Sequence, residues 1–245
     1  MKETLIYGRN AVLESLGEET SKLFIQQGLK EGMIKKIVGR ARDFNIPIIQ
    51  KNKSQLDELC HGANHQGVIS IHSSFEYSTV DEILEDAKCQ GEDPLIVLLD
   101  QVQDPHNLGA IARSALALGA HGLVILKHRS ASVSSGSYKS SAGAIDHLKI
   151  AQVTNLSQTI ADLKDRGLWI YGADARGDEI YKTNLTGPVG LIIGAEGKGL
   201  RDSTKKHVDV LVSIPMGGKF ESLNASAAAS ILLYEIQRQR HGTRG

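Results

Sequence analysis

The chain of 245 residues is 41% hydrophobic, enough for one large or two small domains, and its formal net charge is zero. No run approaches the roughly 20 apolar residues that span a membrane, and the first residues lack the apolar core of a signal peptide. Cys60 and Cys89 are isolated, without CxxC spacing, and favour reduced thiols in a cytoplasmic protein. The histidines also lack metal-ligand spacing, apart from the loose pair His61 and His65, so we expect no metal.

The zero net charge hides an uneven distribution along the chain. Residues 1–74 hold 10 Lys and Arg against 8 Asp and Glu, and residues 94–245 hold 17 against 13. Between them, residues 75–93 hold 1 against 7, so an acidic linker cancels two mildly basic halves. Mild positive charge on both halves permits a nucleic-acid partner without requiring one.

Residues 1–74 alternate short apolar strands with helices, a pattern typical of helices packed around a sheet. We expect strands at 5–8, 22–26, 46–50 and 65–72 and helices at 10–16, 32–45 and 54–60, the last capped by Ser54. The second helix is rich in basic residues, namely Lys35, Lys36, Arg40 and Arg42. On charge alone, a solvated helix face explains these residues better than a binding site does.

The acidic linker, residues 75–93, holds the expected boundary between two domains. Its middle part has the helical spacing of Val80, Ile83, Leu84 and Ala87. This spacing fits a short helix at the head of the second domain, and equally a hinge.

From Pro94 onward, apolar strands alternate with helices, which indicates an α/β domain with a parallel sheet and ligands at the carboxyl ends of its strands. The run at 95–100 is continuously apolar, as expected for a strand buried on both faces. We expect the strands at 95–100, 121–126, 168–173, 189–193 and 208–214, and helices at 110–118, at 156–166 and after Ser222.

The turn before the helix at 110–118 carries candidate polar residues. Asp104 followed by Pro105 resembles a helix cap with proline in the first turn. His106 and Arg113 are seven apart and would share a helix face, whereas Asn107 and Arg113 are six apart and would not. An arginine on this apolar helix is either an edge residue with a buried stem or a binder of carboxylate or phosphate.

A glycine-rich loop, residues 194–200, follows the strand at 189–193. It does not match a phosphate-binding P-loop, because Gly199 follows Lys198 where Ser or Thr is required. Glu196 is the unusual residue, a carboxylate among glycines at a strand end. It could accept a hydrogen bond from a ribose or an amine, or it could cap a helix that begins near Arg201.

The stretch from Ser213 to Glu235 joins a strand to a long helix through a second glycine-containing loop. Pro215 ends the strand, and Ser222 or Asn224 can accept hydrogen bonds from the first N–H groups of the helix. The helical spacing predicts one face made of Leu223, Ala227, Ile231 and Tyr234, and we expect this face to pack into the core. A ligand site and a tight turn that packs a small-residue helix explain this stretch about equally well.

Three of these stretches, taken together and in order, closely resemble the motifs of the SpoU (TrmH) branch of the SPOUT RNA methyltransferases. They are residues 104–113, residues 193–200 and residues 214–224, and the resemblance covers roughly 94–245. Residues 1–74, with Tyr7-Gly8 and the run His65-Gln-Gly-Val, resemble the RNA substrate-binding domain of the ribosomal-RNA members, which shares its fold with certain ribosomal proteins. The whole layout is similar to bacterial 23S rRNA guanosine-2′-O-methyltransferases.

The resemblance implies a deep trefoil knot in the C-terminal domain, with S-adenosylmethionine bound in it. It places these residues around the cofactor: Ile193, Gly194, Ile214, Met216, Leu223 and Asn224. It places these at the transfer site: Asn107, Arg113, Glu196, Ser222 and Asn224. Arginine has a pKa above ~12 and is a poor base, so the safer expectation puts Arg113 near the ribose hydroxyl and its phosphate, with proton acceptance as one role.

The resemblance also implies partners. We expect 23S ribosomal RNA or a precursor of the large subunit as substrate, with Lys35, Lys36, Arg40 and Arg42 as phosphate contacts. A homodimer through the helix at 224–237 would use Leu232, Leu233 and Ile236 as apolar surface. A tRNA ribose methyltransferase is the alternative within the family, although the compact tRNA members lack the N-terminal domain. A non-catalytic RNA-binding protein of ribosome assembly is the alternative outside it.

Overall fold

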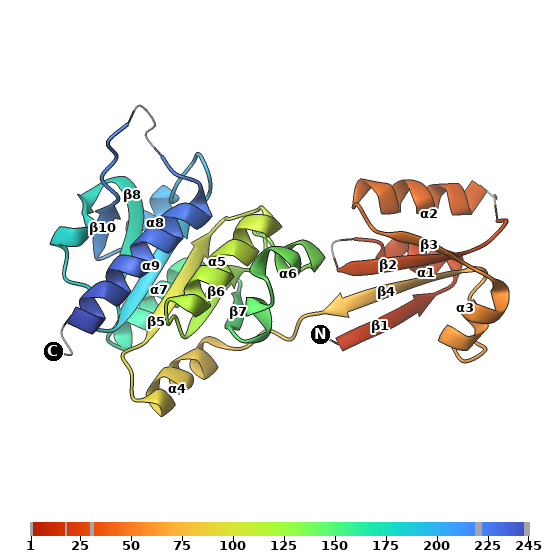
Figure 1. Ribbon diagram of the computed structural model, residues 1–245, viewed down its shortest axis with the longest axis horizontal. Coiled ribbons are helices and arrows are strands. Elements are labelled where there is room, and N and C mark those ends of the chain that lie inside the picture. Colours follow the sequence, from red (N-terminus) through yellow and green to blue (C-terminus); the bar gives the residue numbers. More distant parts are fainter. Residues whose placement is uncertain (1, 18, 30–31, 219–221, 243–245) are drawn as a thin grey trace. The chain divides into compact units, whose positions relative to one another are not determined.

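The computed structural model describes the chain except residues 1, 18, 30–31, 219–221 and 243–245 (Figure 1). Residues 219–221, which belong to the stretch at 214–224 that resembles a family motif, therefore lie outside the described residues. The chain divides into two compact units, Met1–Glu76 and Tyr77–Gly245. Within the described residues, no helix is both long and apolar enough to cross a bilayer.

The first unit is a four-stranded sheet with helices on both faces, as the alternating pattern predicts. Its strands are β1 (Lys2–Tyr7), β2 (Thr20–Gln26), β3 (Ile48–Lys51) and β4 (Val68–Ser74), in the order β1-β4-β2-β3. Strand β4 runs antiparallel to β1 and β2, whereas β2 and β3 are parallel. Helices α1 (Arg9–Ser15) and α2 (Gly32–Asp43) contribute to one apolar cluster, and α3 (Lys53–Leu59) to another.

The cap of α3 differs from the expected one. Asn52, and not Ser54, caps the helix: its side chain accepts a hydrogen bond from the Gln55 N–H at 2.9 Å. The Gln55 side chain accepts one in return from the Asn52 N–H at 3.0 Å. This reciprocal capping box satisfies two N–H groups, so the helix begins one residue before Ser54.

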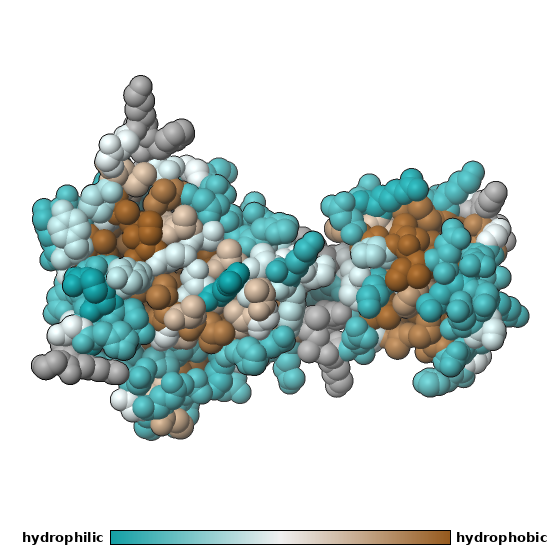
Figure 2. Space-filling view, viewed as in Figure 1, coloured by the Kyte–Doolittle hydropathy of each residue, from teal (hydrophilic) through white to brown (hydrophobic). Residues whose placement is uncertain are grey.

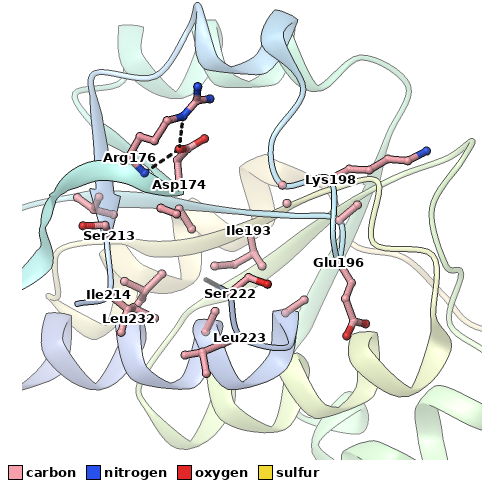
Figure 3. Close-up of a pocket in the computed structure, with 18 of the residues that line it drawn as sticks. Asp174, Arg176, Ile193, Glu196, Lys198, Ser213, Ile214, Ser222, Leu223 and Leu232 are labelled. Atoms are coloured by element: carbon pink, nitrogen blue, oxygen red, sulfur yellow. Dashed lines mark hydrogen bonds and ion pairs between the residues drawn. The ribbon is translucent and has the colours of Figure 1, made fainter. Parts of the chain in front are cut away.

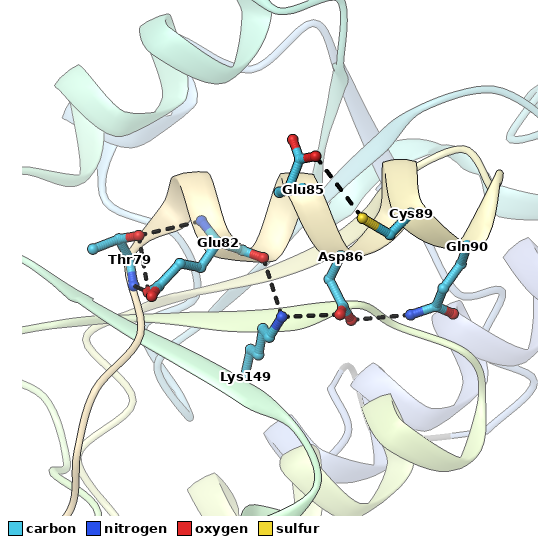
Figure 4. A network of polar contacts seen from close by, with 7 residues as sticks. All are labelled: Thr79, Glu82, Glu85, Asp86, Cys89, Gln90 and Lys149. Atoms are coloured by element: carbon cyan, nitrogen blue, oxygen red, sulfur yellow. Dashed lines mark hydrogen bonds and ion pairs between the residues drawn. The ribbon is translucent and has the colours of Figure 1, made fainter.

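The expected acidic linker contributes a helix, α4 (Val80–Gln90), to the second unit. Thr79 and Glu82 cap it reciprocally, and Lys149 joins it to the sheet by an ion pair with Asp86 at 2.9 Å (Figure 4). The Ile83 side chain is fully buried, and a Cβ on Gly122 would lie 2.6 Å from it. This helix is therefore packed on the sheet, which excludes the hinge alternative for its residues.

The second unit holds a six-stranded sheet in which all neighbouring strands are parallel, as expected. Its strands are β5 (Leu95–Asp100), β6 (Gly122–Leu126), β7 (Lys149–Val153), β8 (Trp169–Glu179), β9 (Val189–Gly194) and β10 (Val210–Ser213), in the order β10-β8-β9-β5-β6-β7. Every residue of β5 and β9 is buried, which confirms the prediction from the apolar run at 95–100. The trefoil knot stays a prediction.

Helices cover this sheet, and the loops at the carboxyl ends of its strands build the site. They are α5 (Pro105–Ala117), α6 (Ser135–Ser141), α7 (Leu156–Asp165), α8 (Asp202–Lys205) and α9 (Ala225–Gly242), with short 3₁₀ turns at Ala144–Asp146 and Ile180–Lys182. Helix α5 begins at Pro105 and not at Ala110, because Asp104 caps it by accepting the His106 N–H at 2.9 Å. Neither β7, which contains polar residues, nor the serine-rich α6 was expected from the sequence pattern.

The last helix, α9, packs through a different face from the expected one. Its buried residues are Ala225, Ala229, Leu232, Leu233 and Ile236. Ile231 and Tyr234, assigned to the core from their spacing, are 42% and 60% exposed. Both stripes have helical spacing on a helix rich in Ala and Ser, so periodicity does not select between them. The packing of α9 against α5 and β9 decides which stripe is buried.

Candidate active site

A cavity of about 290 Å³ opens where β9 and β10 end and α9 begins, beside the middle of β8 (Figure 3). Five of the expected cofactor residues line it, namely Ile193, Gly194, Ile214, Met216 and Leu223. The sixth, Asn224, is not part of the lining, although its neighbour Ser222 is. Loops that are distant in the sequence therefore meet around one hollow, as expected at the carboxyl edge of a parallel sheet.

The loop after β9 is a tight turn at one wall of this cavity. A Cβ on Gly194 would lie 2.2 Å from the Gly199 carbonyl carbon, so only glycine allows this close approach. Backbone hydrogen bonds of 2.8 and 3.2 Å between Ala195 and Gly199 close the turn. The turn projects Glu196 toward the ends of α5 and α9, while Lys198 points away from the cavity (Figure 3).

Three of the predicted transfer-site residues form one hydrogen-bonded cluster at this rim. The Asn107 Nδ2 donates to Glu196 Oε2 at 3.2 Å. The Asn224 Nδ2 donates to Asn107 Oδ1 at 2.9 Å and lies 3.4 Å from Glu196 Oε1. Glu196 is therefore a hydrogen-bond acceptor of this cluster, and it does not cap α8. We call Asn107, Glu196 and Asn224 the rim cluster.

Asn224 has two tasks, and both depend on its position at the start of α9. Its Oδ1 accepts hydrogen bonds from the Ser226 N–H at 2.9 Å and from the Ala227 N–H at 3.3 Å. It thus caps the helix with one end of its amide and holds the rim cluster with the other. Asn107 is 6% exposed in the first turn of α5, so its amide has few alternative partners.

Arg113 does not join the rim cluster. It lies on the exposed side of α5, like His106, whereas Asn107 lies on the buried side, as their spacing predicts. Within the described part of the chain, its guanidinium has no hydrogen bond or ion pair. The structure thus brings together three of the five predicted transfer-site residues, puts Ser222 on the cavity wall and leaves Arg113 outside the cluster.

A charged corner of the cavity was missed in the sequence. The Asp174 carboxylate, in the middle of β8, pairs with Lys205 at 2.5 Å and accepts the Arg176 N–H at 3.0 Å. Burial raises the pKa of Asp174, but the Lys205 ammonium and the Arg176 N–H outweigh it, so the pKa lies below its ordinary value. The run Asp-Ala-Arg-Gly after a strand was the only available signal.

A second carboxylate, fully buried, ties two site loops together. Asp100 ends β5 and accepts hydrogen bonds from the Arg201 N–H at 3.0 Å and its Nε at 2.6 Å. Arg201 directly follows the loop that carries Glu196. This ion pair therefore fixes the loop after β9 against the strand that leads to α5 and Asn107.

Comparison with known proteins agrees with this geometry. A family model described as the SpoU rRNA Methylase family matches residues 94–234, and one described as RNA 2′-O ribose methyltransferase substrate binding matches residues 5–78. The chain belongs to the SpoU methyltransferase family. It is 39% identical to the TrmH family tRNA/rRNA methyltransferase YacO of Bacillus subtilis, over 96% of each chain.

Two solved structures extend the comparison. The SpoU methyltransferase AviRb from Streptomyces viridochromogenes, in complex with the cofactor AdoMet, is 29% identical with a TM-score of 0.64, covering 98% of this chain and 91% of that one. The TrmH/SpoU tRNA modifying enzyme of A. aeolicus is 30% identical with a TM-score of 0.57, covering 62% of this chain and 78% of that one.

S-adenosylmethionine is the cofactor of this family, and the cavity fits it chemically. Ile193, Ile214 and Leu223 offer apolar contact for a flat base, and the glycine turn offers bare backbone groups for its polar edge. The carboxylate of Glu196 can attract a positive charge of the cofactor, whereas that of Asp174 is already paired with Lys205. The chain is thus an S-adenosylmethionine-dependent tRNA/rRNA methyltransferase of the SpoU family.

Proposed function

We propose that the chain methylates the ribose 2′-hydroxyl of a guanosine in 23S ribosomal RNA, naked or in a precursor of the large subunit, in the cytoplasm. The presence of both units carries this proposal. The A. aeolicus tRNA modifying enzyme matches only 62% of the chain, a share that the second unit alone can supply. The first unit matches a substrate-binding model for ribose 2′-O-methyltransferases, which supports a target that a compact enzyme would not select.

We further propose that the rim cluster orients the target ribose. When bound, S-adenosylmethionine supplies an electrophilic methyl group. The 2′-hydroxyl is a very weak acid, so its oxygen needs a group that takes up or shares its proton as the new O–CH₃ bond forms. Glu196 can accept a hydrogen bond from this hydroxyl, while the amides of Asn107 and Asn224 hold its carboxylate in position. Ser222 can contact the ribose from the cavity wall.

Arg113 has a separate part in the proposal. Its guanidinium is exposed and without a described partner, so it is available to a phosphate beside the target ribose. Such a contact stabilises the transition state if it strengthens as the ribose oxygen attacks. Proton acceptance by Arg113 is a second role that the pH dependence of methyl transfer can test.

We propose that the protein is a homodimer that covers the exposed face of α9. Brown, apolar side chains gather on the surface over this helix (Figure 2). Ile231 and Tyr234 on this face are 42% and 60% exposed, and they replace the buried Leu232, Leu233 and Ile236 as the expected contacts. The Ser114 and Ser230 hydroxyls join α5 to α9 at 2.7 Å, so Arg113 lies close to the proposed interface. Light scattering at micromolar concentration should give twice the monomer mass; a monomer mass would contradict the proposal.

In the first unit, the proposed RNA contacts are the basic residues of α2. Lys35, Lys36 and Arg42 are exposed and have no described partner. Arg40 is partly committed to the fold, because its Nε donates to the Leu16 carbonyl at 3.1 Å and its guanidinium lies 5.9 Å from the Phe44 ring. We therefore expect Arg40 to contribute least to RNA binding among the four.

Mapping ribose methylation in rRNA and tRNA from a deletion strain tests the proposed target. One guanosine of 23S rRNA should lose its 2′-O-methyl group, and the wild-type gene should restore it. A gene with Asn107→Ala should not restore it, although the protein accumulates. Loss of a tRNA ribose methyl group with intact 23S rRNA would overturn the proposed target and favour the tRNA alternative.

A further inference from the structure

The loop after β6 carries a cluster of exposed basic side chains that the site described above does not use. Lys127, His128 and Arg129 follow directly on the strand, and Lys139 lies on α6, which comes next. All four are exposed. Among the residues that the structure describes, none of these side chains has a hydrogen bond or an ion pair.

Hydrogen bonds hold this loop beside the segment that positions Asn107. The Ala131 N–H and the Ser130 hydroxyl donate to the Val102 carbonyl, at 2.8 and 3.1 Å. Val102 lies two residues before Asp104, the cap of α5. Because β5, β6 and β9 are parallel, the basic loop and the loop of Glu196 also lie at the same edge of the sheet.

Helix α6 continues this arrangement on the flank of α5. A Cβ on Gly109 would lie 2.1 Å from the Ser140 Oγ and 2.2 Å from the Ser137 carbonyl, so the two helices are in close contact. The Ser140 hydroxyl donates to the Gly136 carbonyl at 3.1 Å within its own helix. Lys139 is the charged side chain of α6. It therefore lies next to α5, the helix that carries Asn107 of the rim cluster.

The charge of this edge contrasts with other parts of the second unit, where many cations form ion pairs with acids. The described ion pairs include Arg166–Asp81, Lys149–Asp86, Lys164–Asp209, Lys205–Asp174, Arg201–Asp100 and Arg238–Glu235. At the basic edge, the nearby acids have other partners: Asp104 accepts a backbone N–H, and Asp146 accepts the Tyr138 hydroxyl at 3.0 Å. Neither carboxylate forms an ion pair with Lys127, Arg129 or Lys139, and these cations outnumber the two acids, so positive charge predominates at this edge and favours a polyanion.

The fold itself does not require arginine at position 129. Its backbone φ is 59°, in the left-handed region that glycine or asparagine adopts more readily. Its side chain is exposed and makes no hydrogen bond, ion pair or ring contact with the residues that the structure describes. An arginine at this position therefore suggests a binding role for its guanidinium, whose planar donors suit phosphate oxygens.

We propose that Lys127, Arg129 and Lys139 bind backbone phosphates of the substrate RNA next to the target nucleotide, so that the catalytic unit has an RNA contact of its own. This inference rests on the proposed RNA methylation and adds the surface that holds the substrate. The phosphate contacts position the ribose over the rim cluster without reading the sequence, which is left to other contacts.

The test compares the full-length wild type with Lys127→Gln/Arg129→Gln and with the matched control Lys88→Gln/Lys206→Gln. The control removes two exposed charges near the opposite edge of the sheet. Lys88 lies in the last turn of α4, which leads into β5. Lys206 lies just after α8, where the chain approaches the start of β8. Binding to 23S rRNA fragments and to tRNA is measured over a range of salt concentrations. Calorimetry with S-adenosylmethionine and thermal unfolding check that each variant is folded.

Removing two phosphate contacts should lower the slope of log K against log salt by about 1.4 to 1.8. RNA affinity near physiological salt should fall roughly tenfold or more, with a raised KM for RNA, a nearly unchanged kcat and unchanged cofactor affinity. The control should match the wild type. A variant with wild-type slope and affinity would overturn the inference, and so would a wild type whose RNA binding is independent of salt. If the methylated RNA is a tRNA, the proposed target is wrong, and the slope on that tRNA still decides the inference.

Discussion

The two units of this chain present polar groups in different ways. In the first unit, four basic residues lie along one helix, α2, because they share the exposed face that its apolar periodicity leaves. In the second unit, Asn107, Glu196 and Asn224 come from three segments up to 117 residues apart and meet through hydrogen bonds of 2.9 to 3.4 Å. A local pattern thus produces a charged surface, whereas topology produces a site, and mutations in the two should differ in kind.

The largest expected effect is at Arg113, which belongs to the site by proposal and not by described contact. Arg113→Ala should lower single-turnover methyl transfer by about 10³-fold, because a phosphate contact and help with the hydroxyl proton are both lost. Arg113→Lys keeps the charge but loses the planar fork, so it should restore little. S-adenosylmethionine binding, followed by calorimetry, should stay close to wild type. A near wild-type rate in Arg113→Ala would remove this residue from the reaction.

The pH dependence separates the two roles of Arg113. If its guanidinium accepts the proton, the wild-type rate should rise with pH, and this limb should vanish in Arg113→Lys. If it only binds phosphate, the two profiles should have the same shape at different heights. The comparison uses rates at saturating RNA and cofactor, so that binding does not contribute.

The next effect concerns the rim cluster itself. Glu196→Gln keeps the shape of the side chain but turns one of its oxygens into a donor that faces the Nδ2 groups of Asn107 and Asn224. Methyl transfer should fall about 10²-fold, and the KM for RNA should change little, because the proposed phosphate contacts, which supply most of the RNA affinity, lie elsewhere. Glu85→Gln, on the exposed face of α4, serves as control. Full activity in Glu196→Gln would show that this carboxylate only supports the loop.

Much of the fold could be predicted, because buried parallel strands leave long apolar runs, as at 95–100 and 189–193. Strand β7 and helix α6 could not, because Lys149 and Gln152 interrupt one and serines fill the other. The face of α9 was wrong because two stripes share its period. The rim cluster came from family resemblance; spacing along α5 correctly separated Asn107 from Arg113. Asp174 and the basic loop after β6 were missed, since only the folded chain shows which charged side chains line the cavity and which lack an ion pair.

A smaller effect is expected from the surface of α2. Lys35→Glu/Lys36→Glu should weaken RNA binding about tenfold across sequences, since these contacts are electrostatic, and should leave cofactor affinity unchanged. Combining it with Lys127→Gln/Arg129→Gln sharpens the comparison between the units. Independent contacts should give additive free energies of binding. Equal RNA affinity for wild type and the α2 variant would remove α2 from the interface.

The smallest effect is on stability, and both units supply a buried histidine for it. His121 in the second unit accepts the Leu95 N–H on its Nδ1 at 3.0 Å, so its Nε2 carries the proton of the neutral ring and faces Glu92 at 3.6 Å. Burial lowers the pKa of His121, although Glu92 opposes it. His72 in the first unit lies 2.8 Å from the Ser70 hydroxyl, and burial lowers its pKa against the effect of Glu19.

A lowered histidine pKa destabilises the fold in acid. Above the unfolded pKa of ~6.5, the histidine is neutral in both the folded and the unfolded state, so its full contribution to stability is present. Below this pH, the unfolded chain binds the proton first, and the free energy of unfolding falls until the pH reaches the folded pKa. Each histidine can contribute a slope of at most about 1.4 kcal/mol per pH unit in this window.

Urea unfolding at pH 7.5 and 5.5, followed by the fluorescence of the single tryptophan, Trp169, reports on the second unit. His121→Asn keeps an acceptor for the Leu95 N–H but does not titrate, so it should flatten the acid loss seen with this probe, whereas His72→Asn should not. An unchanged pH slope in His121→Asn would mean that His121 is protonated without cost in the folded unit.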